Sequence, residues 1–133
     1  ALSIIKNGPE SFAGRKLDGA RKYTLTFDVR NLPPVTAFWE LPVYDSYGYF
    51  VDNPIDRYSA TSYLYRAGAY KVKDDKLTFY LQSERPAEPD KVANWLPIPR
   101  SGGFQLAARF YGPLSALIDG TYPRPRILEN RVP

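Results

Sequence analysis

The sequence predicts an all-β fold, an antiparallel sandwich or barrel with one short helix near the C-terminus. Turn signals divide the chain into about seven short segments, several of which alternate apolar and polar residues as half-buried strands do. The 13 prolines and 9 glycines are spread along the whole length, as expected for many short elements joined by turns. No strand is followed by a helical pattern and a second strand, so a parallel α/β sheet is not expected. The 133 residues fit one domain, 1–133, with an irregular lead-in at 1–17.

The first two predicted strands are 22–27 and 38–44, in which apolar side chains occupy alternate positions. Pro42 lies within the second strand and has no amide proton to donate, which predicts an edge position or a β-bulge. Residues 45–48, DSYG, have the composition of a tight turn, and 49–51 are predicted to form the strand that returns from it.

The middle of the chain contains the clearest strand signal, LTFYLQ at 77–82, which alternates strictly. The charged run 73–76 before it is predicted to be a hairpin tip, with a short strand at 69–72. Residues 55–68 fit neither a helical nor a strand period. Residues 83–93 are polar and contain prolines, which indicates a long loop.

The C-terminal part contains one more long strand, a helix and a last short strand. Residues 104–111 follow a Ser-Gly-Gly turn and are predicted to form the long strand. At 113–118 a proline stands at the start and a glycine just past the end, which is typical of a short helix. Residues 126–128 are predicted to form the last strand.

The sequence contains no His and no Cys, which limits its chemistry. Imidazole bases, thiolate nucleophiles, disulfides and metal sites built from Cys or His are excluded. Calcium could bind through carboxylates, but no loop of regularly spaced acids is present. No metal and no cofactor are therefore predicted.

The formal net charge of +4 comes from basic residues that are scattered along the chain. A nucleic-acid-binding protein usually concentrates its cations on one face, so nucleic acid is not the expected partner. No apolar run approaches the ~18 residues of a membrane span, and none is predicted. The chain lacks methionine, which suggests a processed form or one domain of a longer protein.

The segment 44–59, YDSYGYFVDNPIDRYS, contains the first candidates for a ligand-binding site. Arg57 could hold a carboxylate or phosphate through two parallel hydrogen bonds. Tyr44 and Tyr58 would add flat rings and hydroxyl groups. We favour the structural alternative, in which the guanidinium pairs with nearby acids or backbone carbonyls and holds the loop.

A second candidate is Asn94-Trp95, between a polar loop and a Pro-rich stretch. The Trp95 ring could stack a sugar or another flat ligand beside Asn94. We favour the alternative that it plugs one end of the sandwich, with its indole N–H bonded to backbone. Asp45, Asn53 and Pro54 are the expected structural supports of the turns. No catalytic residue is predicted.

Several stretches occur together in the order typical of one family. They are LDGARKYTLTF (17–27), NLPPVTAFWELPVYDSYGYFVDNPIDRYS (31–59), LTFYLQ (77–82), DKVANWLPIP (90–99), ARFYGP (108–113) and LIDGTYPRP (117–125). In these stretches the chain resembles domain-of-unknown-function family 1214. The resemblance implies a jelly-roll-like β-sandwich and a periplasmic or cell-envelope location. It also implies a C-terminal domain of a bacterial protein whose N-terminal half is family 1254. The chain departs from the family at Pro42 and in the Tyr-rich stretch 63–70, which marks a possible contact surface.

Three functions stay open at this point. The expected one is a non-catalytic module that binds a small molecule or glycan, or packs against a partner domain. The second is half of a hydrolase-like enzyme whose Arg, Tyr and Asp side chains form a site completed by a second domain. The third is a structural subunit that forms a homo-oligomer through a sheet edge or the Tyr-rich stretch.

Overall fold

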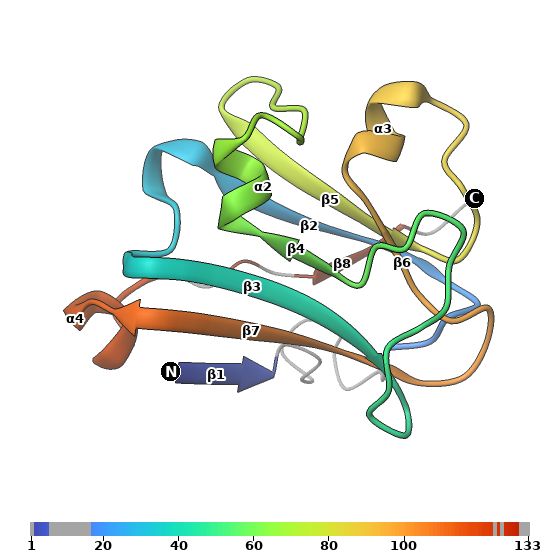
Figure 1. Ribbon diagram of the computed structural model, residues 1–133, viewed down its shortest axis with the longest axis horizontal. Helices are drawn as coiled ribbons and strands as arrows, with labels where there is room; N and C mark the ends of the chain where they lie inside the picture. Colours follow the sequence, from blue (N-terminus) through green and yellow to red (C-terminus); the bar gives the residue numbers. More distant parts are fainter. Residues whose placement is uncertain (1, 6–16, 124, 126, 131–133) are drawn as a thin grey trace.

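Two β-sheets pack against each other around one hydrophobic core (Figure 1). The computed structural model describes residues 2–5, 17–123, 125 and 127–130. In this part of the chain, the first sheet has the strand order β1-β7-β3-β4 and the second has the order β6-β5-β2-β8. The first sheet contains β1 (Leu2–Ile5), β3 (Val35–Asp45), β4 (Ser59–Thr61) and β7 (Phe104–Pro113). The second contains β2 (Lys22–Asp28), β5 (Lys76–Gln82), β6 (Trp95–Pro97) and β8 (Ile127–Asn130). The all-β prediction is confirmed.

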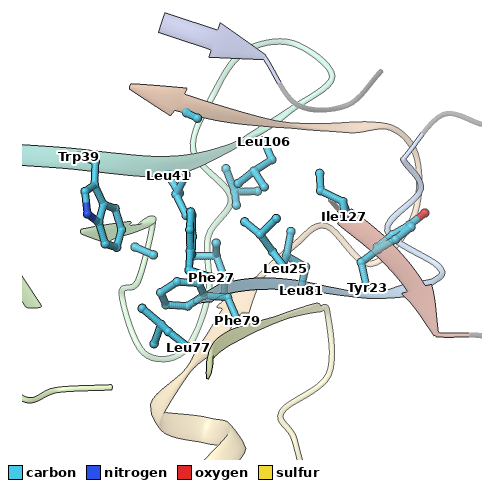
Figure 2. Packing of buried hydrophobic residues seen from close by; sticks show 14 of the residues in the cluster. Tyr23, Leu25, Phe27, Trp39, Leu41, Leu77, Phe79, Leu81, Leu106 and Ile127 are labelled. Carbon is cyan, nitrogen blue, oxygen red and sulfur yellow. The ribbon is translucent and has the colours of Figure 1, made fainter. Parts of the chain in front are cut away.

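Alternate residues of the central strands fill the space between the sheets (Figure 2). The inward side chains are those of Tyr23, Leu25 and Phe27 in β2, Leu77, Phe79 and Leu81 in β5, Trp39, Leu41 and Val43 in β3, and Leu106, Ala108 and Phe110 in β7. The Phe27 ring stacks on the Trp39 ring at 5.6 Å between centroids, so the two sheets touch directly. Burial of each large apolar side chain contributes roughly 1.5–3 kcal/mol. The strands predicted at 22–27, 38–44, 77–82 and 104–111 are therefore confirmed.

Short helices join the strands at more places than the sequence predicted. They are η1 (Val29–Asn31), α2 (Ser62–Arg66), α3 (Pro89–Ala93) and α4 (Ser115–Ile118). The prediction of a helix at 113–118 is confirmed by α4, but the prediction of a single helix is wrong. Helix α3 begins with a proline, whose fixed φ suits the first helical position, inside the segment expected to be a loop. α2 and α3 have five residues each, too few for a hydrophobic period to show.

The sequence predicted antiparallel sheets, but the second sheet contains one parallel pair. β6 pairs with β5 in parallel, with Tyr80 opposite Trp95 and Leu81 opposite Leu96. A parallel pair needs a connection that returns to the same end of the sheet, and the segment that contains α3 makes that crossover. The antiparallel prediction is therefore wrong at this edge.

The prediction that Pro42 lies at an edge or a bulge is also wrong. β3 lies between β7 and β4, and Pro42 is fully buried. The amide of Val43 donates to the carbonyl of Tyr58, just before β4. Amide groups of successive residues point to opposite sides of a strand, so the side on which Pro42 lacks an N–H is the side of β7. Pairing with β7 stops after Glu40 and resumes at Val43 in the same register, whereas the irregularity of this ladder lies between Val35 and Phe38. The sheet thus loses ladder bonds at the proline without shifting register.

Two shorter predictions also need correction. Residues 49–51 form a single bridge, from Phe50 to Tyr44, rather than a return strand. Residues 69–72 are irregular, although the tight turn predicted at 73–76 is present.

The lead-in predicted to be irregular contains a strand. Leu2–Ile5 form β1, which pairs antiparallel with β7. Residues 6–16 of the lead-in lie outside the described residues, as does residue 126 of the last predicted strand. The remainder of that strand is present as the start of β8.

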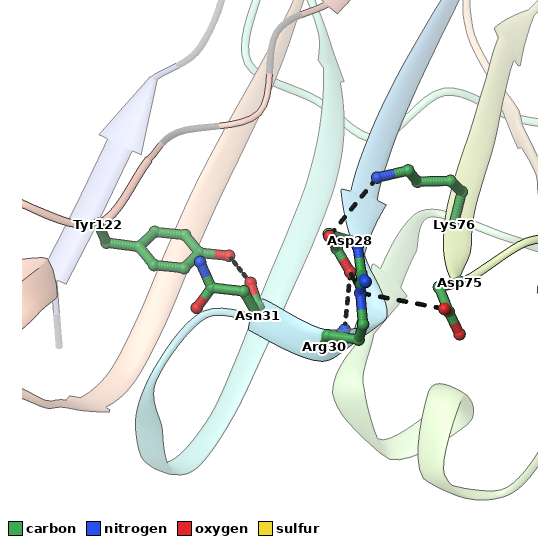
Figure 3. Close-up of polar contacts among 6 residues, drawn as sticks. All are labelled: Asp28, Arg30, Asn31, Asp75, Lys76 and Tyr122. Carbon is green, nitrogen blue, oxygen red and sulfur yellow. Dashed lines mark hydrogen bonds and ion pairs between the residues drawn. The ribbon is translucent and has the colours of Figure 1, made fainter.

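Tyr122 closes the core beside α4. Its side chain is 7% exposed, and its hydroxyl donates to the carbonyl of Asn31 at 2.8 Å (Figure 3). Burial, and to a smaller extent the negative charge of Asp28, raise the pKa of the Tyr122 phenol to about 12. The Asp28 carboxylate is held by Arg30 at 2.8 Å and by Lys76 at 3.5 Å, and these cations lower its pKa.

Replacing Tyr122 with Phe should change the alkaline stability of the protein. Folding raises the phenol pKa from 10.0 to about 12, so the stability it contributes is complete below pH 10 and is lost as the pH rises toward 12. We expect Tyr122→Phe to be less stable by about 1 kcal/mol near pH 8, because it lacks the hydrogen bond. We also expect its free energy of unfolding to fall less steeply above pH 10. Urea unfolding between pH 8 and 11.5 measures both effects.

The matched control is Tyr47→Phe, because the Tyr47 side chain is 84% exposed. It should follow the wild-type curve over the whole pH range. Equal alkaline slopes for wild type and Tyr122→Phe would contradict the proposed contribution of Tyr122.

Candidate functional site

Arg57 holds the chain around helix α3. Its Nη1 atom donates to the carbonyls of Val92 at 3.0 Å, Ala93 at 3.1 Å and Trp95 at 2.8 Å. Helix C-terminal carbonyls lack partners within the helix, and a cation there is also favoured by the helix dipole. The sequence-based alternative in which Arg57 bonds backbone carbonyls matches this geometry, although the carbonyls belong to a distant segment.

Asn53 organises the loop that carries Arg57. Its Oδ1 accepts from the amides of Ile55 at 3.2 Å and Arg57 at 2.9 Å. Its Nδ2 donates to the carbonyls of Val51 at 3.0 Å and Arg57 at 2.8 Å. Pro54 follows within the same loop, where it has no amide proton to leave unsatisfied. The loop is thus closed by one side chain.

Asp45 organises the turn after β3. Its Oδ1 accepts from the amides of Tyr47 at 2.9 Å and Tyr49 at 3.0 Å. The amide of Gly48 donates to the Asp45 carbonyl, and Gly48 has a φ of +86°, which favours glycine. These bonds fix the direction in which the chain leaves the first sheet.

Asn94 and Trp95 are buried, with exposures of 3% and 1%. The Asn94 amide accepts from Lys71 N at 2.8 Å and donates to the carbonyls of Lys71 and Thr78, each at 2.8 Å. The indole N–H of Trp95 donates to the carbonyl of Gln82 at 2.7 Å. The indole bond to backbone is the one the sequence suggested. The ring has no exposed face on which a ligand could stack.

Tyr44 and Tyr58 meet at the surface through a residue that the sequence did not single out. The Phe50 ring lies 5.2 Å from the Tyr44 ring and 5.3 Å from the Tyr58 ring, measured between centroids. The Tyr58 hydroxyl donates to Asp56 at 3.1 Å, and this hydrogen bond raises the pKa of Tyr58. Arg109 donates to the Tyr44 hydroxyl, which raises the pKa of Arg109.

A second aromatic group lies further along the same outer face of the first sheet. The Phe38 ring stacks on Tyr111 at 4.1 Å and contacts Tyr63 at 4.9 Å. Phe38 and Tyr111 alternate with the inward residues of β3 and β7, so they point away from the core. The two aromatic groups and the cation between them, here called the aromatic face, comprise Phe38, Tyr63, Tyr111, Tyr44, Phe50, Tyr58 and Arg109.

The aromatic face could have been predicted from the residues at the outward-facing, alternate positions of the two strands. In β3 these outward-facing residues include Phe38 and Tyr44, and in β7 they include Arg109 and Tyr111. A solvated sheet face usually carries polar residues at such positions.

Among the described residues, two further open clefts lie outside the aromatic face. One, of about 580 Å³, is lined by residues that include Asn53, Pro54 and Trp95, but not by Arg57 or Tyr58. The other, of about 540 Å³, lies beside the turn before β5 and helix α3. Of the residues predicted to bind a ligand, the structure brings Tyr44 and Tyr58 together at the surface and uses the other three within the fold.

Metal and membrane sites were also assessed in the described part of the chain. No group of three or more acidic side chains there could hold a metal ion. No helix among the described residues is long and apolar enough to cross a membrane.

Comparisons with known proteins give a family and a fold relative. The model of a family described as "Protein of unknown function (DUF1214)" matches residues 9–115. The crystal structure of the VPA0106 protein from Vibrio parahaemolyticus, a structural-genomics target, is similar, with a TM-score of 0.76 and 25% sequence identity. The match covers 97% of this chain but only 30% of the VPA0106 chain. No curated protein matches the sequence.

Replacing Arg57 with Met should destabilise the protein, since Met keeps an unbranched stem but cannot donate. Three carbonyls around the end of α3 lose their donor, and we expect a loss of about 2 kcal/mol in the free energy of unfolding. Urea unfolding measures this loss. The control, Arg85→Met, removes an exposed arginine and should change stability by less than about 0.5 kcal/mol. Equal stabilities for the two variants would contradict the structural role of Arg57.

Replacing Asn94 with Ala should cost more, about 3 kcal/mol, because three buried or half-buried backbone groups lose their partner. Hydrogen exchange should show faster exchange at the Lys71 amide and across α3. The exposed Asn130→Ala variant is the control and should match wild type. Unchanged exchange at Lys71 in Asn94→Ala would rule out this hydrogen-bond network.

Proposed function

The chain belongs to the DUF1214 family, and we propose that its domain is a non-catalytic module that packs against another domain of a longer protein through the aromatic face. The observation that carries the proposal is the exposure of large rings on a sheet face. Phe50 is 51% exposed and Tyr63 is 57% exposed, each within a group of rings in contact. Solvent-exposed clusters of this kind mark interaction surfaces.

The composition of the aromatic face suits a protein partner. Tyr, Phe and Arg are enriched in the buried centres of protein interfaces, where rigid rings bury much area at low entropic cost. Arg109 lies between the two aromatic groups and already bonds the Tyr44 hydroxyl, so part of its side chain is ordered before a partner arrives.

The size of the relative supports a partner within the same polypeptide. This chain corresponds to 30% of the VPA0106 chain, so the same fold occurs there beside a much larger portion of protein. A domain in that setting has a neighbour available to cover an exposed aromatic face. A jelly-roll arrangement and a periplasmic or cell-envelope location, both expected from the family resemblance, are part of the same proposal.

The other functions expected from the sequence have less support. A hydrolase-like site would need free Arg, Tyr or Asp groups, whereas the Arg57 guanidinium is bound to backbone carbonyls. A glycan could stack on the aromatic face, and a second copy of the chain could also cover it. These two occupants are therefore included as outcomes of the test.

The test is whether the aromatic face binds the rest of the natural polypeptide, supplied as a separate chain. Isothermal titration calorimetry should show binding by wild type. Phe50→Arg and Tyr63→Arg, one in each aromatic group, should each weaken it by about tenfold or more, as substitutions at interface centres do. Leu128→Arg is the control, because Leu128 is 55% exposed on β8 of the other sheet, and it should bind as wild type does.

Three results would overturn the proposal. The first is wild-type affinity in both aromatic-face variants. The second is binding of a glycan that is lost in these variants, which would favour a carbohydrate-binding module. The third is a wild-type dimer in sedimentation that becomes monomeric in the variants, which would favour self-association.

A further inference from the structure

The outer side of the second sheet carries a cleft that the proposed docking role does not use. Its floor includes Thr78 and Tyr80, which alternate with the buried residues of β5 and so point away from the core. Its walls are the segment that leads into β5 and helix α3, and it encloses about 540 Å³. We call it the lysine cleft, after the four lysines that line it, Lys71, Lys73, Lys76 and Lys91.

The residues that line the lysine cleft carry more positive than negative charge. Its four lysines are opposed within the cleft by two carboxylates, Asp74 and Asp90. In the described part of the chain, Lys71 and Lys73 make no ion pair, and both are exposed. Two ammonium groups are therefore free to bind an anion.

The other two lysines are partly engaged with the protein. Lys76 pairs with Asp28 at 3.5 Å (Figure 3), and Lys91 pairs with Glu88 at 3.8 Å. The Lys91 ammonium also lies 5.3 Å from the centre of the Tyr80 ring, over the cleft floor. Both pairs are exposed enough to be weak, so an incoming anion can compete with the carboxylates.

The walls of the cleft are fixed by hydrogen bonds to the backbone. Asn94, itself 3% exposed, joins the backbone of Lys71 to the backbone of Thr78. The turn at Asp74 and Asp75, with φ values of 52° and 60°, is closed by two bonds between the backbones of Lys73 and Lys76. The backbone segments that carry the lysines are therefore held around one space before any ligand binds, which lowers the entropic cost of binding.

We propose that the lysine cleft binds a small anion of the phosphate class that carries more than one negative charge. Lysine ammonium groups act as point charges suited to phosphate oxygens, whereas paired recognition of a carboxylate favours arginine, which is missing from the described lining. The hydroxyl group of Tyr80 adds a neutral donor on the floor, beside the Thr78 hydroxyl, which is hydrogen-bonded to that of Thr26 at 2.9 Å. Asp74 and Asp90 interrupt the positive surface, so the cleft fits a compact anion better than the continuous backbone of a nucleic acid.

The experiment is titration of pyrophosphate into the 133-residue protein at low ionic strength, followed by isothermal calorimetry. Wild type should bind saturably at one site, more tightly than it binds sulfate. Lys71→Gln and Lys91→Gln should each raise Kd about fivefold, the size expected for one weak ion pair. Their combination should raise Kd further. Arg100→Gln removes an exposed positive charge at the other cleft and should leave Kd unchanged.

Vesicles that contain phosphatidic acid distinguish a lipid headgroup from a free anion as the source of the phosphate. Vesicle binding that is lost in the double lysine variant supports the cleft and identifies the lipid source, and pyrophosphate binding without vesicle binding supports a free anion. Equal Kd values for wild type and the double variant, or non-saturable binding no tighter than sulfate, would overturn the proposal. Tighter binding of an oligonucleotide than of pyrophosphate would overturn it as well. Circular dichroism of each variant checks that the fold is retained.

Discussion

The side-chain amide of Asn94 is the interaction on which the second sheet and its outer surface depend. It is almost fully buried and uses one acceptor and two donor bonds on backbone groups of two other segments. An amide that satisfies backbone groups in this way fixes positions that apolar packing alone leaves loose. Because Asn94 also ends α3 and precedes β6, the same amide sets where the parallel edge strand begins. Arg57 secures the other side of this junction through the carbonyls at the end of α3.

These bonds explain why the polar residues most suggestive of a ligand site act within the fold. A segment with little regular structure still has to satisfy its backbone N–H and C=O groups when it is buried. Asn53, Arg57 and Asn94 supply those partners in the loop before β4 and around α3. The surfaces left for binding are the outward faces of the two sheets. One carries stacked rings around Arg109, and the other carries the lysine cleft.

The predictions that succeeded rest on local periodicity, and those that failed depend on distant contacts. β2, β5 and β7 were predictable because an inward apolar residue at every second position is visible in a short window. Helices α2 and α3 are too short for such a period. Pro42 was expected at an edge because it cannot donate, yet the long β3 strand keeps its register with bonds on both sides of the missing one. For the candidate site, Tyr44, Tyr58 and the stretch that contains Tyr63 were identified, but Phe50, Phe38, Arg109 and Tyr111 were not.

The sequence by itself determined the all-β class, the inward faces of the central strands and the chemistry available without imidazole or thiol, because composition and side-chain alternation are properties of the chain alone. Only the tertiary structure decided which polar groups stay available for binding. Arg57 lies 38 residues from Trp95 along the chain, and Asn94 lies 23 residues from Lys71, so no local pattern reveals that these groups are partners. Buried polar side chains are almost always hydrogen-bonded within the protein, and which of them find backbone partners is set by long-range contacts.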